Sequence, residues 1–163
     1  MPTRDLTLAM VGSGGDGVVT MGDMMAQAGA RDGLNVIKVE AYGPQIRGGE
    51  SSCVLRMSAE PISAQGDAVD VLVVFNWADF GRFKGEVVPK ADAVILYEAA
   101  DPVPLSEVKI PTATNATWIP VPFAEIATKS AGTKAAKNIV TLGILAELFS
   151  IPQESVRKAV EFK

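Results

Sequence analysis

The sequence contains no histidine, and Cys53 is its only cysteine. Histidine is the commonest general base and the commonest metal ligand in proteins, so the chain lacks the usual residue for both tasks. A single thiol cannot form a disulfide within the chain, nor can it supply the thiolates of a structural zinc site or an iron–sulfur cluster. If the chain belongs to a redox enzyme, we therefore expect the metal to lie in another chain.

Long apolar runs and a concentration of positive charge are also missing. The net charge is −4, and the basic residues are scattered rather than gathered in a run that could follow a phosphate backbone. No apolar stretch approaches the roughly 18 residues of a membrane span, and the apolar run near the N-terminus is too short for a secretory signal. These absences favour a cytoplasmic protein that binds neither nucleic acid nor membrane.

Strand and helix patterns alternate along the 163 residues, which suit one domain. The alternation predicts a single three-layer α/β domain over residues 1–163 with a mostly parallel sheet. Residues 51–58 alternate as a half-buried strand does, and residues 69–76 are nearly all apolar, as in a central strand. Strands are predicted at 6–11, 34–40, 51–58, 69–76, 91–98 and, at an edge, 117–122. Helices are predicted at 18–33, 77–84, 123–132, 133–150 and 152–163.

The sequence also predicts the burial of particular helices and side chains. The helix at 133–150 is apolar around most of its circumference, so we expect it to be deeply buried or covered by a partner, a second copy included. The last helix reaches Lys163 without a capping signal, which suggests a fragment of a longer chain. Trp77 and Phe80 are interpreted as core residues. The same packing role is assigned to Met21, Met24 and Met25.

Four glycines between residues 12 and 17 follow the first strand and open the first helix. Gly12, Gly14 and Gly17 match the dinucleotide fingerprint G-x-G-x-x-G. Glu40 ends the second strand, roughly where an acid that binds a ribose is expected. Against this hypothesis, the turn after Glu40 carries a tyrosine, a proline and an arginine where the adenosine should lie.

Two other interpretations of this loop remain open. Residues 15–17, Gly-Asp-Gly, are also similar to the first residues of the motif that binds thiamine diphosphate and magnesium. That motif ends in an asparagine, and residues 40–47 contain none. The loop can also be a plain tight turn, whose N–H groups would still suit an anion at the helix N-terminus. The candidate anion loop comprises Gly12, Gly14, Gly15 and Gly17.

The turn between the second and third strands, YGPQIRGGE, is the more specific signal. Gly48 and Gly49 permit a sharp backbone excursion and the close approach of another surface. Arg47 offers a planar fork of donors for a carboxylate or phosphate. The turn lies beside the carboxyl ends of the first two strands, where sites form in open α/β sheets. Tyr42, Gly43, Arg47, Gly48 and Gly49 are therefore predicted to form a surface that faces a partner or substrate.

Four segments in this order resemble the gamma subunit, or gamma domain, of the 2-oxoacid:ferredoxin oxidoreductases, which act on pyruvate, 2-oxoglutarate, 2-oxoisovalerate or indolepyruvate. They are GSGGDGVVTMGDMMAQAGARDG, YGPQIRGGESSCVLRMS, VDVLVVFN and KNIVTLGILAELF. The turn is especially similar to forms in which the gamma domain is fused ahead of an alpha, pyrimidine-binding domain, so the chain would continue into that domain. Asp16 departs from the family, which commonly has glutamine there.

The resemblance implies a complex that oxidatively decarboxylates a 2-oxoacid to an acyl-CoA and reduces ferredoxin. Thiamine diphosphate and magnesium would belong to the alpha and beta parts, and the iron–sulfur clusters to beta, delta or ferredoxin-like parts. This chain would be a Rossmann-like domain with no catalytic or metal-binding residue of its own. It would pack against those parts and, in some members, help to enclose coenzyme A. We expect the isolated chain to be inactive; the alternative is a stand-alone NAD- or FAD-binding module.

Replacement of Arg47 by alanine tests whether the turn has a role beyond shape. If its guanidinium holds a carboxylate or phosphate, the lost charge-assisted hydrogen bond is worth roughly 1.5–3 kcal/mol. In the full complex, Arg47→Ala should therefore lower activity, or affinity for coenzyme A or the partner, at least about tenfold. The melting temperature should hardly change, because an exposed substitution costs under about 0.5 kcal/mol. Arg47→Lys should rescue only in part, and wild-type behaviour in both variants would contradict the role.

Overall fold

The computed structural model describes residues 5–44 and 48–162. A six-stranded sheet with the strand order β2-β3-β1-β4-β5-β6 forms the middle layer. The strands are β1 (Asp5–Ser13), β2 (Asn35–Tyr42), β3 (Glu50–Ser58), β4 (Val69–Val74), β5 (Pro89–Glu98) and β6 (Thr117–Val121). The helices are α1 (Val18–Arg31), α2 (Trp77–Phe83), α3 (Phe123–Ala131), α4 (Lys137–Leu148) and α5 (Gln153–Glu161). Short 3₁₀ turns cover residues 105–107 and 134–136.

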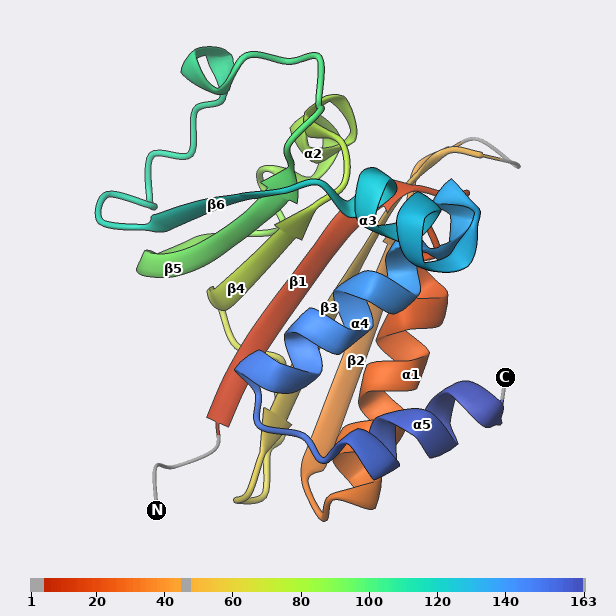
Figure 1. Ribbon diagram of the computed structural model, residues 1–163. Helices are drawn as coiled ribbons and strands as arrows, with labels where there is room; N and C mark the ends of the chain where they lie inside the picture. The colour runs from red at the N-terminus through yellow and green to blue at the C-terminus, as the bar shows by residue number, and fades with distance from the viewer. Residues whose placement is uncertain (1–4, 45–47, 163) are drawn as a thin grey trace.

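Helices cover both faces of the sheet and bury two separate clusters of apolar side chains. In Figure 1, α1, α4 and α5 lie together across one face. The cluster on this face includes Met21, Met24 and Met25 and strand residues such as Leu8 and Met10. On the other face, the side chains of α2, Trp77 and Phe80 among them, pack on the intervening strand residues. The three-layer α/β fold and the core roles of these side chains are therefore confirmed.

The sheet is mostly parallel, as predicted, but β3 runs against its neighbours. Strand β4 pairs in parallel with β1 and with β5, and β5 pairs in parallel with β6. Strand β3 lies between β1 and β2 and is antiparallel to both. The connection from β2 to β3 spans only residues 43–49, whereas a parallel crossover needs about a dozen residues or more. The short connection therefore makes β2 and β3 a hairpin and leaves β2 at the edge.

Helix α4 is shorter than the helix predicted at 133–150, and it is buried on one side rather than around its whole circumference. It has 12 residues and begins after the 3₁₀ turn at 134–136. Leu142 and Leu145 are buried within the chain. Its exposed large apolar side chains, Ile139 and Leu148, are nine positions apart and so lie on opposite sides of the helix. Because Gly143 and Glu147 share the exposed face with Ile139, this helix presents no broad apolar surface.

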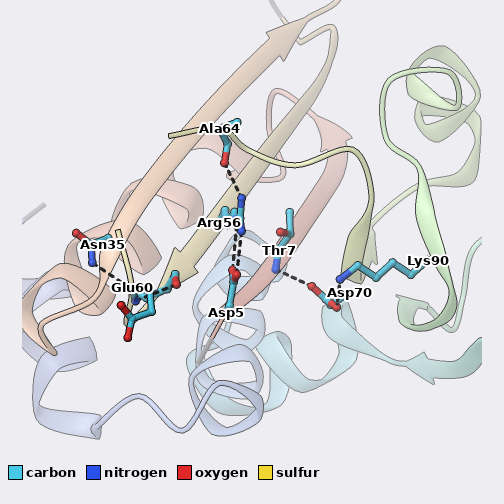
Figure 2. Close-up of polar contacts among 9 residues, drawn as sticks. Asp5, Thr7, Asn35, Arg56, Glu60, Ala64, Asp70 and Lys90 are labelled. Carbon is cyan, nitrogen blue, oxygen red and sulfur yellow. Dashed lines mark hydrogen bonds and ion pairs between the residues drawn. The ribbon is translucent and has the colours of Figure 1, made fainter. Parts of the chain in front are cut away.

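At the amino-terminal end of the parallel strands, hydrogen bonds and ion pairs link side chains of neighbouring strands (Figure 2). The guanidinium of Arg56 on β3 donates to both carboxylate oxygens of Asp5 on β1, at 2.9 and 2.8 Å, and to the carbonyl of Ala64 at 3.0 Å. The carboxylate of Asp70 accepts from the backbone N–H of Thr7 at 2.9 Å and from Lys90 Nζ at 2.6 Å. The hydrogen bond with Arg56 lowers the pKa of the Asp5 carboxyl. These charged groups are thus committed to holding strands together.

In the described parts of the chain, none of the helices has the length and apolar character needed to span a bilayer.

Helix α1 can approach β3 closely because two of its buried positions are glycines. A Cβ at Gly22 would collide with Cys53 Sγ, and one at Gly29 would come within 2.7 Å of Met57 Sδ. Burial raises the pKa of the Cys53 thiol under this helix to about 12. The absence of side chains at these glycines therefore sets the distance between the first helix and the sheet.

Gly22→Ala and Gly143→Ala should have opposite effects on stability. Alanine normally stabilises a helix interior over glycine by about 0.5–1 kcal/mol, and nothing lies within 4 Å of a Cβ at Gly143, so Gly143→Ala should stabilise the protein. Gly22→Ala should instead destabilise it by about 1–3 kcal/mol, because the methyl group has no room above Cys53. Chemical denaturation measures both changes, and equal effects at the two glycines would contradict the close approach.

Candidate functional site

The two glycine-rich segments of the sequence meet at the carboxyl ends of β1 and β2. The N–H of Gly14, in the loop after β1, donates to the carbonyl of Gly49 at 2.8 Å. A Cβ at Gly14 would lie only 3.4 Å from the Cα of Gly48. The N–H of Gly43 donates to the carbonyl of Glu50 at 2.7 Å, which closes the base of the β2–β3 hairpin. The small size of glycine thus lets the loop and the hairpin contact each other through their backbones.

The glycine loop is held by a carboxylate from within the loop. Asp16 accepts hydrogen bonds from the backbone N–H of Ser13 at 2.9 Å and from its hydroxyl at 3.2 Å. The other carboxylate oxygen of Asp16 pairs with Lys137 Nζ at 2.5 Å, and Lys137 also lies over the ring of Phe75. Both side chains of this ion pair are mostly buried. Asp16 therefore has a structural role, and its charge sits where an incoming anion would meet the loop.

The first turn of α1 remains open beside this closed loop. Gly17 precedes the helix in a left-handed conformation, with φ of 74°, and within residues 5–44 and 48–162 no side chain caps this turn, which itself contains no acid. The first N–H groups of a helix have no partner within the helix, which applies here to those of Val18, Val19 and Thr20. A hollow of about 270 Å³ lies against these residues and against Gly14 and Tyr42. The helix dipole makes such a place favourable for an anion.

A charged cluster borders this hollow on the β2 side. Lys38 makes ion pairs with Asp23 of α1 and with Glu40, and the hydroxyl of Tyr42 donates to Glu40. Burial alone would lower the pKa of Lys38, but the hydrogen bonds with Asp23 and Glu40 outweigh it and raise the pKa. The hydrogen bond with Lys38, followed by that with Tyr42, lowers the pKa of Glu40. Glu40 is therefore a charged, fully engaged carboxylate.

Two further acids lie near the loop with oxygens that have no partner. Glu50 Oε2 and Asp79 Oδ2 are buried and accept no hydrogen bond within residues 5–44 and 48–162. Burial raises the pKa of Asp79; a hydrogen bond with Ser13 opposes this effect, and the charges of Asp16 and Glu50 add to it. Glu50 also lines the hollow. The hollow is thus bordered by the first turn of α1 on one side and by Glu50 of the hairpin on the other.

The predicted site residues divide into three groups. Gly14, Gly17, Tyr42, Gly43, Gly48 and Gly49 all line the hollow. Gly12 is buried, where its carbonyl accepts a hydrogen bond from the hydroxyl of Ser51, and Gly15 lies in open space outside the hollow. Arg47 lies outside the described residues. Sequence reasoning missed Thr20 and Glu50, which also line the hollow. It also missed Asn138, whose side chain packs against Gly17: its amide nitrogen lies 2.6 Å from the position that a Cβ of Gly17 would occupy.

The geometry argues against the two cofactor interpretations of the loop. In dinucleotide-binding domains, the acid that binds the ribose ends the strand beside β1. Here β3 takes that place, so Glu40 lies near the end of a strand about 9–10 Å from β1. Asp16 is engaged by Ser13 and Lys137 rather than available for magnesium. Among the residues that the structure describes, no three side chains of His, Cys, Asp or Glu gather as a metal site.

The arrangement defines an α/β domain with a self-closed glycine loop and an open helix N-terminus beside a glycine-rich hairpin. Residues 7–163 match the family described as pyruvate ferredoxin/flavodoxin oxidoreductase, and the chain belongs to that family.

Known members of the family show similarity over nearly the whole chain. Ketoisovalerate oxidoreductase subunit VorA of Methanothermobacter marburgensis is 35% identical over 98% of this chain, which spans only 32% of that protein. The 2-oxoglutarate synthase subunit KorC of Methanocaldococcus jannaschii is 30% identical, over 94% of this chain and 80% of that subunit. A structure of 2-oxoglutarate:ferredoxin oxidoreductase from Magnetococcus marinus, with 2-oxoglutarate, coenzyme A and succinyl-CoA bound, has a TM-score of 0.81 and 29% identity, and covers 95% of this chain and 26% of that one.

Titration with NAD or FAD should show no binding at micromolar concentrations. The ribose-binding acid is displaced by β3, and Asp16 places a negative charge inside the loop that would meet the pyrophosphate. Isothermal calorimetry on the protein measures this directly. A dissociation constant near 1 μM, or about 8 kcal/mol of binding free energy, would contradict the geometric argument and favour a dinucleotide-binding module.

Proposed function

We propose that this chain is the gamma-type part of a 2-oxoacid:acceptor oxidoreductase. The complex oxidatively decarboxylates a 2-oxoacid: carbon dioxide leaves, the acyl group passes to the thiol of coenzyme A, and the electron pair passes to ferredoxin. The proposal rests on the family match over residues 7–163, together with the open hollow at the end of α1. Its partners are the alpha and beta parts and, in some arrangements, a delta part.

The donor set of this chain suits a supporting role in that complex. An iron–sulfur cluster needs several thiolates, but the sequence has only Cys53, which is fully buried and has a pKa raised by burial. The acid that would hold the magnesium of thiamine diphosphate, Asp16, is already bound to Ser13 and Lys137. These residues do not fit either group, so we assign both cofactors to the partner chains and derive no catalytic step from this chain.

We assign to the hollow the binding of an anionic group of coenzyme A. The free N–H groups at the start of α1 suit a phosphate oxygen, and the helix dipole favours its charge. Glu50, on the opposite side, can accept a hydrogen bond from a hydroxyl or amide of the same ligand. Coenzyme A carries phosphates, hydroxyls and amides along one chain, so it satisfies both sides. Tyr42 is 60% exposed and is available to contact the ligand or the neighbouring part of the complex.

Substitutions of Thr20 separate ligand binding from helix stability. Thr20 is exposed, lines the hollow and occupies the third position of α1. A carboxylate there should stabilise the helix N-terminus by about 0.3–1 kcal/mol, yet repel a phosphate. In the co-purified complex, Thr20→Glu should therefore leave the melting temperature unchanged or raised, while the KM for coenzyme A increases at least about tenfold. The measurement is reduction of ferredoxin that depends on both the 2-oxoacid and coenzyme A.

Thr20→Gln is the matched control, because it adds similar bulk without charge and should change the KM little. Equal effects of the two substitutions would indicate a steric cause and contradict the phosphate site. If the tagged chain purifies from its native cell without a thiamine-dependent partner, the proposal for the whole complex is wrong.

A further inference from the structure

Strand β2 presents a free edge, and its hydrogen-bonding groups alternate in a known pattern. The bond from Gly43 N–H to the carbonyl of Glu50 marks this pair as hydrogen-bonded in the register of β2 and β3. Alternate residues back along β2, including Val39, therefore direct their backbone groups toward β3. The residues between them direct theirs outward, and they are Val36, Lys38, Glu40 and Tyr42. The opposite edge strand, β6, contains Pro120 and so lacks one of its N–H donors.

We propose that two copies of this chain pair antiparallel through β2, about a two-fold axis at Val39, and so join their sheets. In this register Lys38 of one copy lies opposite Glu40 of the other, and Val36 lies opposite Tyr42. These are the residues whose N–H and C=O groups point outward, so about eight backbone hydrogen bonds can form. A shift of the axis to Lys38 or to Glu40 would place like charges opposite each other, which destabilises a strand pair.

The position of α1 supports this pairing. A Cβ at Gly22 would lie 3.5 Å from Lys38 Cδ on β2 and would also touch Cys53 on β3, so α1 lies over these two strands. Neighbouring strands are about 4.8 Å apart, which places α1 of the two copies about 10 Å apart across the joined edge. Helices pack at 8–10 Å. Helical geometry places Val19, Ala26 and Ala30 on the same side of α1 as Asp23, which pairs with Lys38 on β2. These side chains are small enough for such an approach, with Phe162 at the end of α5 beside Ala30.

The opposite face of β2 offers apolar side chains to the same contact. Val39 is 44% exposed on this face, between Ile37 and Ala41, which are half-buried. About the proposed axis, Val39 meets its own copy, and Ile37 meets Ala41 of the other copy. The edge is thus complementary to itself in hydrogen bonds, charge and apolar contact. This inference goes beyond the proposed function and does not depend on it.

Sedimentation equilibrium tests the pairing on the 163-residue chain. We expect the wild type to form a dimer that dissociates on dilution. Glu40→Lys makes Lys38 face a second lysine across the axis, and should raise the dissociation constant at least about tenfold. Glu40→Gln, which keeps size and hydrogen bonding, should have a smaller effect. A wild type that remains monomeric at 100 μM (about the concentration for a weak specific dimer) would overturn the proposal.

Cysteine cross-linking tests the register. Residues in a non-hydrogen-bonded antiparallel pair have Cα atoms about 4.5 Å apart, within disulfide range. Val39→Cys should therefore give a disulfide-linked dimer under mild oxidation. Ile37→Cys alone should not, but it should link to Ala41→Cys when the two variants are mixed. Cys53 is buried and should not react. Circular dichroism and melting temperature confirm that each variant is folded.

Failure of folded Val39→Cys to cross-link, or equal cross-linking by Ile37→Cys alone, would contradict the two-fold axis at Val39. A dimer that forms without either disulfide pattern would also contradict it, because the contact would then lie on another surface.

Discussion

The short connection between β2 and β3 is the constraint on which the rest of this structure depends. Residues 43–49 are too few for a crossover, so β3 turns back and takes the place beside β1. Three consequences follow. The acid at the end of β2 moves one strand further from the glycine loop. The glycines of the hairpin come within hydrogen-bonding distance of Gly14. Strand β2 itself becomes the edge of the sheet, and its backbone groups that point away from β3 have no strand beside them among the described residues.

The charge of Asp16 determines which part of the loop remains available. Its carboxylate takes the Ser13 donors and joins them to Lys137 at the start of α4, so the loop is stable without a bound anion. The donors that remain are those at the first turn of α1, on the side of the hairpin. A dinucleotide needs the loop, the helix and an acid on the adjacent strand together. A single anionic group needs only the helix N-terminus, which is the part that stays open.

The sequence predicted the elements of this fold better than their arrangement. Periodicity located the strands and helices because each buries a face, and Pro120 placed β6 at an edge. The direction of β3 could have been inferred from the connection length alone. The pair of Asp16 with Lys137 could not, because it joins residues 121 positions apart in sequence (137 minus 16) that only the packing of α4 brings together. Glu50 was missed because an acid at a strand start carries no signal of its own, and Arg47 stays a prediction.

The two ends of the sheet differ in how fully their polar groups are paired. At the amino-terminal end, Arg56, Asp5, Asp70 and Lys90 pair with one another and tie β1 to β3, β4 and β5. At the carboxyl end, Glu50 Oε2 and Asp79 Oδ2 are buried without a hydrogen-bond partner among the described residues. An unsatisfied buried polar atom costs about 1–3 kcal/mol, so the ion-paired amino-terminal end offsets a cost that the carboxyl end carries. Ligands of open α/β sheets bind at the carboxyl ends of the strands, so the less satisfied end of this sheet is also the end at which a ligand is expected.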